Sequence, residues 1–380
     1  MKKTIFITGA TGNIGAKLTS HILSTDSDSR LILLVRGRSY PDACDRLERI
    51  LRITSPEFDL NLLHNRAEIV CGDITESSLG LSNDDYGRIA RRITHIIHSA
   101  AATKFNVSLS SARTINVEGT LNVMKLALAA HATGELKGVA YLSTAYVCGT
   151  QRGTIMEEQT TIPDAFSNAY EQSKWESEGE VGKLRDRLPI TVFRPSIVVG
   201  DSRTGRIATL NVLYTPLRFI CRGLVSIVPG HGDVPLDVVP VDYVAKAIAA
   251  IFLGSDGGTG RCFNLVAGDG QTMTSGQVLT KALAYFTSRS VLAAKSKIRF
   301  LPPVLFRSVA SFLSGRSKKM LEQLGVFTPY ISLKRTFDDT NTRQALQNTG
   351  VCVPKLSDYL DNILAFCVET GWGRKTRRAA

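Results

Sequence analysis

The sequence predicts an α/β fold, in which a doubly wound parallel sheet is joined to a smaller, mostly helical C-terminal region. Short apolar runs alternate with segments of helical periodicity over the first 200 residues. Parallel strands are buried on both faces and need helical crossovers between them, so this alternation is typical of such a sheet. After Gly200 the alternation weakens, and from Thr274 onward the pattern is mostly helical and basic.

The individual elements follow from the same patterns. We expect sheet strands at residues 3–9, 31–37, 67–74, 94–101, 138–147, 189–200 and 261–268. Apolar residues spaced three and four apart predict helices over residues 13–24, 41–53, 114–130, 168–184 and 239–254. The first domain then covers residues 1–200 plus 236–268, and the second covers 201–235 plus 269–380. A break is expected at Leu301, because two prolines follow it.

Composition excludes several classes of protein. The chain has 380 residues, 43% of them hydrophobic and 21% charged, which is typical of a globular protein. No apolar run reaches the roughly 18 residues of a membrane span. The apolar stretch before Thr8 is too short for a signal peptide, so we expect a cytoplasmic protein. The seven cysteines form no CxxC pair, so neither a disulfide framework nor a metal site is expected.

The net charge of +12 is concentrated near the C-terminus. From Lys281 to the end there are 8 Lys and 9 Arg against 4 Asp and 2 Glu. Such a region attracts phosphate, an acidic protein, an anionic membrane or nucleic acid, or is simply a solvated surface. Basic and aromatic residues do not interleave there, so we expect no nucleic-acid partner.

A glycine-rich turn, TGATGNIG at residues 8–15, follows the first predicted strand and leads into the first helix. Gly9 permits a tight turn, Gly12 lets the backbone approach a pyrophosphate, and Gly15 lets the helix pack on the strand. The helix N-terminus then offers free N–H groups to phosphates. In this context the turn predicts a Rossmann-type dinucleotide-binding domain.

The end of the second predicted strand indicates which dinucleotide is bound. An NAD enzyme usually places an acid there against the ribose 2′-hydroxyl. Here the strand ends in Arg36 and Arg38 with no acid between them. Guanidinium groups suit a 2′-phosphate, so we predict NADPH, with Arg36 as the principal contact.

Tyr170 and Lys174 are four residues apart in a predicted helix and therefore share one face. A free tyrosine has a pKa of about 10, and a nearby lysine favours its ionised form. Thr144, at the end of the fifth predicted strand, supplies a hydroxyl that can hold a substrate oxygen beside the tyrosine. The alternative is an ordinary surface helix pair and a β-branched strand residue.

The chain resembles the extended short-chain dehydrogenase/reductases over about residues 1–268. The resemblance rests on TGATGNIG (8–15), GDI (72–74), HSAA (98–101), NVEGT (116–120), LSTAYV (142–147), YEQSK (170–174) and FRPSIVVG (193–200). Three stretches look most like fatty acyl-CoA reductases and thioester reductase domains, namely HSAAATKF (98–105), STAYV (143–147) and DVVPVDYV (237–244). Sugar-nucleotide epimerases share the general order.

The resemblance implies a role for each matching residue. Thr144 falls at the active-site Ser/Thr position, with Ser143 as the alternative, Tyr170 is the acid, and Lys174 assists it. The implied cofactor-binding residues are Gly9, Thr11, Gly12, Asn13, Ile14, Gly15, Arg36, Arg38, Asp73, Ile74, Ser99, Ala100, Ala101, Lys174, Pro195 and Ser196.

The implied reaction is NADPH-dependent reduction of an acyl thioester, on coenzyme A or a carrier protein, to an aldehyde or alcohol. We expect no acyl-cysteine at Cys148, because no histidine lies at a recognisable spacing. The basic, partly apolar segment at residues 301–319 is expected to dock an acidic carrier, cover an acyl chain, touch a membrane surface or pack as a lid helix.

Two kinds of alternative function stay open. The same fold serves nucleotide-sugar epimerases or dehydratases and hydroxysteroid-type dehydrogenases. A cofactor-sensing protein without turnover keeps the glycine turn, but such proteins commonly lose the Tyr/Lys pair.

Overall fold

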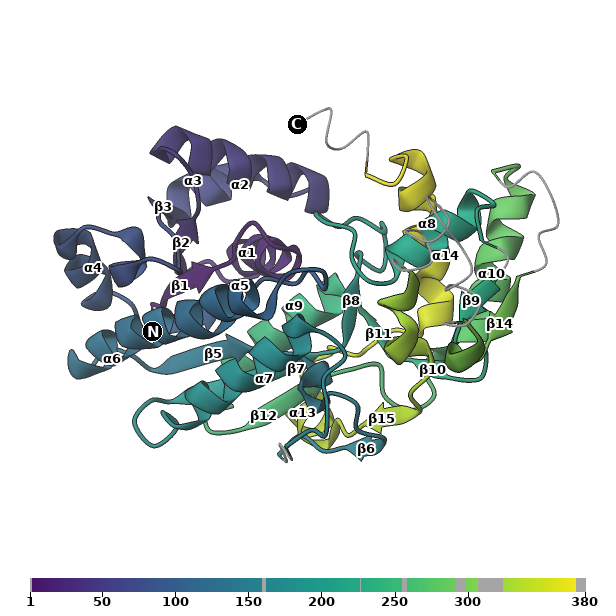
Figure 1. Ribbon diagram of the computed structural model, residues 1–380. Helices are drawn as coiled ribbons and strands as arrows, with labels where there is room; N and C mark the ends of the chain where they lie inside the picture. The colour runs from purple at the N-terminus through teal and green to yellow at the C-terminus, as the bar shows by residue number, and fades with distance from the viewer. Residues whose placement is uncertain are drawn as a thin grey trace.

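A seven-stranded parallel sheet forms the centre of the computed structural model, which describes residues 2–158, 162–225, 227–254, 258–291, 298–306 and 324–373 (Figure 1). The strand order is β12-β7-β5-β4-β1-β2-β3. The strands are β1 (Thr4–Thr8), β2 (Arg30–Val35), β3 (Ala67–Cys71), β4 (His95–His98), β5 (Gly138–Leu142), β7 (Ile190–Pro195) and β12 (Cys262–Leu265). The predicted doubly wound sheet is confirmed, and the order reverses between β1 and β4.

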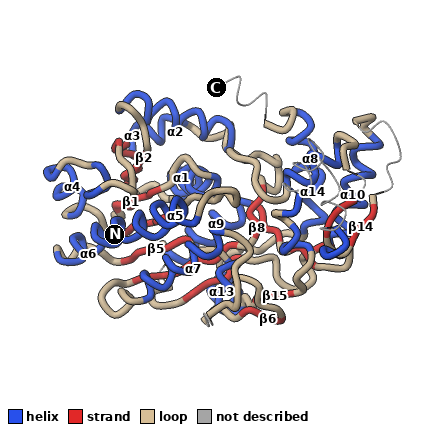
Figure 2. The backbone as a smooth tube through the Cα atoms, in the orientation of Figure 1, coloured by secondary structure: helices blue, strands red, loops and turns tan. Residues whose placement is uncertain are grey.

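Helices cover both faces of this sheet, as the flanking coils in Figure 2 show. Along β1, Ile5 and Ile7 belong to one apolar cluster and Phe6 to the other, because successive side chains point to opposite faces. One cluster includes α1 (Asn13–Thr25), α2 (Tyr40–Thr54), α3 (Leu60–Arg66), α9 (Val241–Phe252) and α13 (Thr340–Leu346). The other includes α4 (Asn83–Ala90), α6 (Gly119–Ala132) and α7 (Ala169–Gly182).

A third apolar cluster lies beyond the carboxyl ends of β5 and β7, on the side drawn in green and yellow in Figure 1. It is built on α8 (Tyr214–Cys221), α10 (Ser275–Ser288), η4 (Thr328–Ile331) and α14 (Leu356–Glu369). It also takes in Tyr146, Ile155 and Ile197 from the N-terminal part of the chain. The two parts of the molecule therefore share one continuous core at this junction.

Four short strand pairs lie outside the central sheet. They are β6 (Gly153–Ile155) with β15 (Arg335–Phe337), β8 (Ile197–Val199) with β11 (Val238–Pro240), β9 (Ile227–Pro229) with β14 (Arg299–Leu301), and β10 (Pro235–Leu236) with β13 (Met273–Thr274). The end of β14 at Leu301 agrees with the predicted break.

Several boundaries differ from the sequence expectation. The run at 138–147 leaves the sheet at Leu142, because the Thr144 side chain accepts a hydrogen bond from Tyr146 N and starts a 3₁₀ turn, η3 (Ala145–Cys148). The run at 189–200 divides into β7 and β8, which pair with different strands. The helix expected at 114–130 starts earlier, with α5 (Leu109–Arg113) and a π-helical turn η2 (Thr114–Glu118). The short 3₁₀ turn η1 (Ser77–Gly80) and helices α3 and α4 were not expected.

Among the described residues, no helix is long and apolar enough to cross a membrane. All seven cysteines are free. No group of His, Cys, Asp and Glu in the described ranges is arranged to hold a metal ion. The basic segment at 301–319 is described only as far as residue 306, so the contacts expected of it lie largely outside the described residues.

Candidate active site

A cavity of about 340 Å³ opens at the carboxyl ends of the central strands, where the strand order reverses. Ligands of doubly wound sheets bind at this switch point. Almost all of the predicted site residues line it, namely Gly9, Thr11, Gly12, Asn13, Ile14, Arg36, Asp73, Ile74, Ser99, Ala100, Ala101, Thr144, Tyr170, Lys174, Pro195 and Ser196. Gly15 and Arg38 are not among its lining residues.

The glycine turn forms one wall of the cavity. Gly9 has a φ of +75°, and a Cβ there would lie 2.6 Å from Ala100 N. Gly12 N donates to Gly9 O at 2.8 Å, and α1 begins at the next residue with no side-chain cap. Gly15 lies behind the turn, where a Cβ would be 2.1 Å from Gly9 O. The open backbone at Gly9 and Gly12 leaves N–H groups at the start of α1 facing the cavity. Gly15 packs against the turn, and this explains why it does not line the cavity.

Two guanidinium groups stand at the end of β2. The Arg36 Nη1 lies 3.8 Å from Asp73 Oδ2, and its side chain is 59% exposed. The second group is Arg46 of α2, which lines the cavity and donates to Arg36 O at 2.9 Å. Burial and the neighbouring Arg36 charge lower the pKa of Arg46. Sequence reasoning expected Arg38 here and missed Arg46, because only the turn into α2 brings Arg46 back to the strand end.

Tyr170 and Thr144 are brought together at the inner end of the cavity. Tyr170 is the second residue of α7, whose N-cap Asn168 accepts from Glu171 N. Burial raises the pKa of Tyr170 to about 12, and its hydrogen bond with the Thr144 hydroxyl opposes that rise. The Phe105 ring packs beside Tyr170, with centroids 5.9 Å apart. Tyr170 therefore keeps its proton at neutral pH and can donate it.

Lys174 lies one helical turn further along α7 and is 2% exposed. Its Nζ donates to Leu142 O at 2.7 Å and to Tyr141 OH at 2.8 Å. Burial lowers the pKa of Lys174 to about 7. In the described part of the chain, its hydrogen bonds thus go to β5 and not to Tyr170.

A buried chain of hydroxyl groups continues from Lys174 across the sheet. Tyr141 OH donates to Ser177 Oγ at 2.8 Å, and Ser177 Oγ donates to Thr120 Oγ1 at 3.0 Å. The His98 ring joins Thr120 Oγ1 at 2.9 Å and Thr8 Oγ1 at 2.7 Å. Burial lowers the pKa of His98 to about 3, so this ring is neutral. The network connects Lys174 to Thr8, the first residue of the glycine-rich turn, and no sequence motif indicated it.

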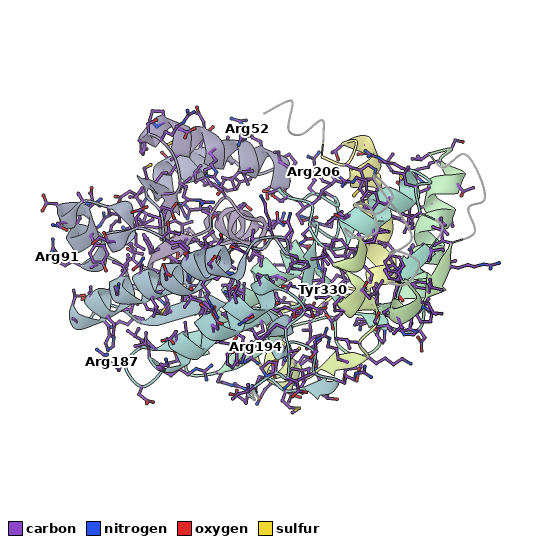
Figure 3. All side chains as sticks on the ribbon, in the orientation of Figure 1. Arg52, Arg91, Arg187, Arg194, Arg206 and Tyr330 are labelled. Atoms are coloured by element: carbon purple, nitrogen blue, oxygen red, sulfur yellow. The ribbon has the colours of Figure 1, made fainter. Side chains whose placement is uncertain are left out.

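A buried ion pair fixes α7 against β7. Arg194 Nε donates to Glu178 Oε1 at 3.1 Å, and the two side chains are 3% and 7% exposed. Arg194 also donates to Glu157 O. Figure 3 labels Arg194 next to α7. The helix that carries Tyr170 and Lys174 is thus held in place relative to the strand ends.

Residues from beyond Gly200 complete the cavity. Asn13 exchanges two hydrogen bonds with the backbone of Thr209, at 3.0 and 2.8 Å. Tyr330, from η4, contributes its ring to the wall and is labelled near the middle of the molecule in Figure 3. The sequence did not indicate Tyr330, since the C-terminal hundred residues match no recognised motif.

Comparison with known proteins agrees with this geometry. The NAD-binding family described as male sterility protein matches residues 7–248. The chain is 28% identical to an aldehyde reductase from Aspergillus flavus, over 94% of this chain and 35% of that protein. It is 27% identical to a fatty acyl-CoA reductase from Drosophila melanogaster, over 65% of this chain and 53% of that protein. The chain thus spans only about a third to a half of these curated relatives.

Several solved structures match nearly the whole chain. One of them is the terminal R domain of the myxalamid PKS-NRPS biosynthetic pathway, with a TM-score of 0.80 and 28% identity. The alignment covers 97% of this chain and 91% of that domain. The similarity therefore extends through the C-terminal part, which the sequence motifs did not reach.

Proposed function

The chain belongs to the male sterility protein family of NAD-binding proteins, and from this premise we propose that it reduces an acyl thioester to an aldehyde or alcohol with NADPH. The observation that carries the proposal is the meeting of Thr144 and Tyr170 beside the glycine turn, in one cavity with Lys174. Two relatives that match most of the chain are named as an aldehyde reductase and a fatty acyl-CoA reductase, which favours reduction over epimerase or dehydratase chemistry.

The cavity fits a nicotinamide dinucleotide. The absence of a side chain at Gly9 and Gly12 leaves the backbone open, and the N-terminus of α1 suits a pyrophosphate. Arg36 and Arg46 favour a 2′-phosphate and hence NADPH over NADH. When bound, the nicotinamide supplies the hydride.

Two hydroxyl groups of the chain act on the thioester carbonyl. As the hydride adds to the carbonyl carbon, negative charge develops on its oxygen, and Thr144 and Tyr170 donate hydrogen bonds to it. The Tyr170 proton then passes to that oxygen and gives a hemithioacetal. The positive charge of Lys174 would lower the free energy of the ionised tyrosine, and its ammonium group would hold the nicotinamide ribose. When the hemithioacetal collapses, the C–S bond breaks, the hydroxyl proton is lost, and the thiolate leaves and takes a proton.

The thioester handle is an anionic phosphopantetheine arm, carried by coenzyme A or by a carrier protein. A basic C-terminal region suits either one. We propose that residues 1–200 plus 236–268 bind the cofactor and that the remaining residues bind the acyl group and its carrier.

A panel of acyl-CoA and carrier-bound thioesters tests the proposal. NADPH consumption and free thiol are followed together, with NADH in a parallel series. We expect NADPH oxidation matched by thiol release, and the ratio of the two separates aldehyde from alcohol. Cofactor binding without thiol release on any thioester would reject the proposed reaction.

A further inference from the structure

A second cavity lies next to the cofactor cavity, inside the C-terminal apolar cluster. It has a volume of about 70 Å³ and is walled by apolar side chains of α8, α10 and the segments around η4. These include Leu217, Ile220, Val278, Leu279 and Phe327. Ile197, Val212 and Tyr330 line both cavities, so the two are separated by single side chains.

Contacts of both its ring and its hydroxyl hold the Tyr330 side chain between the two cavities. Its ring stacks on Phe105 with centroids 5.5 Å apart and meets the Tyr146 ring edge-on at 4.9 Å. Its hydroxyl donates to Glu171 Oε1 at 2.5 Å and accepts from Asn168 Nδ2 at 2.9 Å. Only 6% of the residue is exposed. A side chain constrained in this way has one position, so the partition is a fixed wall.

The Tyr330 hydroxyl is hydrogen-bonded to the start of α7, the helix that carries Tyr170. Glu171 is the next residue along the chain, is fully buried, and also accepts from Ser167 N at 2.9 Å. Phe105 packs against both Tyr330 and Tyr170. The partition and the proposed proton donor are therefore held by the same short stretch of α7.

We propose that Tyr330 is a specificity-determining residue, whose ring separates the reacting end of the cavity from an apolar acyl subsite and limits the length of the acyl chain. This inference rests on the proposed function. The second cavity has the volume of about two water molecules, so its occupant is the apolar end of a short acyl group. A longer chain has to displace the Tyr330 ring, together with its stacking and its two hydrogen bonds.

Butanoyl, octanoyl and dodecanoyl thioesters of pantetheine test the inference, because pantetheine is common to coenzyme A and carrier proteins. Tyr330→Ala removes the partition, and Tyr330→Phe keeps the ring without its hydroxyl. Tyr285→Ala is the matched control, since Tyr285 is a tyrosine buried in the same apolar cluster that lines neither cavity.

We expect Tyr330→Ala to raise kcat/KM for the dodecanoyl relative to the butanoyl thioester by about tenfold or more, as a change in an apolar pocket does. Tyr330→Phe and Tyr285→Ala should keep the wild-type preference for the short chain. Equal chain-length profiles for Tyr330→Ala and Tyr285→Ala would overturn the inference.

Calorimetric binding of the same thioesters separates this inference from the proposed reaction. We expect Tyr330→Ala to bind the dodecanoyl compound about tenfold more tightly than Tyr285→Ala does, even where no NADPH is oxidised. Equal affinities of Tyr330→Ala and Tyr285→Ala for the dodecanoyl compound would overturn the inference that Tyr330 separates the two cavities. Tighter binding by Tyr330→Ala without any turnover would count against the proposed reaction alone.

Discussion

Replacing Tyr141 by Phe should shift the pH dependence of the enzyme, because the Tyr141 hydroxyl supports the charged form of Lys174. In the structure Lys174 Nζ donates to that hydroxyl at 2.8 Å, and burial has already lowered the pKa of Lys174 to about 7. A hydrogen bond to a charged group contributes about 1.5–3 kcal/mol, and one pKa unit corresponds to about 1.4 kcal/mol. Losing the hydroxyl should therefore lower the pKa of Lys174 by about one to two further units.

The assay is the pH profile of kcat/KM. In the wild type we expect the rate to fall as pH rises through about 7, where Lys174 loses its proton. In Tyr141→Phe the same fall should occur about one to two pH units lower. Ser177→Ala is the control, because it removes the acceptor of the Tyr141 hydroxyl but keeps the hydroxyl to which Lys174 donates, and it should shift the profile less. Superimposable profiles for Tyr141→Phe and the wild type would refute the reasoning.

Three further predictions concern the cofactor site and stability. Arg36→Ala and Arg46→Ala should each raise KM for NADPH by about tenfold with little change in KM for NADH, because a charge-assisted hydrogen bond contributes at least about 1.4 kcal/mol. Arg38→Ala should leave KM unchanged for both cofactors. Gly15→Ala should lower the free energy of unfolding by about 1–3 kcal/mol, measured by urea denaturation, because its Cβ overlaps the turn backbone. Burial lowers the pKa of His98 to about 3, so as pH falls below about 6.5 the unfolded chain binds a proton at His98 before the folded chain does. Between pH 6.5 and about 4, the free energy of unfolding should therefore fall by about 3 kcal/mol less in His98→Gln than in the wild type.

Each of these has a contrary result. Equal losses of affinity for NADPH and NADH in the arginine variants would remove the 2′-phosphate argument. Unchanged urea stability of Gly15→Ala would mean that the turn can open without strain. Parallel acid unfolding of His98→Gln and the wild type would show that the imidazole is not the group that titrates.

Much of the fold and part of the site could be predicted because the signals are local. Buried strands such as residues 30–35 are continuous apolar runs, and the glycine turn carries its own conformational requirement at Gly9. The end of the fifth strand could not be placed, since Thr144 stops it with a side-chain hydrogen bond rather than with a glycine or proline. Helices α3 and α4 were not predicted because each is too short for a clear helical periodicity, although Asp59 and Ser82 cap their N-termini.

The missed site residues depend on contacts between distant parts of the chain. Arg46 reaches the cavity only after α2 folds back on β2, and Tyr330 reaches it across 159 residues from Glu171. The hydroxyl chain from Lys174 to Thr8 crosses several elements, and none of its members is unusual in sequence. Such contacts follow from packing, which a local pattern does not encode.

The transfer of deuterium tests the central claim most directly. NADPH deuterated at the reacting carbon of the nicotinamide is incubated with an acyl thioester, and the product and free thiol are analysed by mass spectrometry. We expect one deuterium at the former thioester carbon of the aldehyde for each thiol released, and a rate lowered by about 100-fold or more in Tyr170→Phe with NADPH binding retained. Thiol release without deuterium in the product, or full turnover by Tyr170→Phe, would contradict the account.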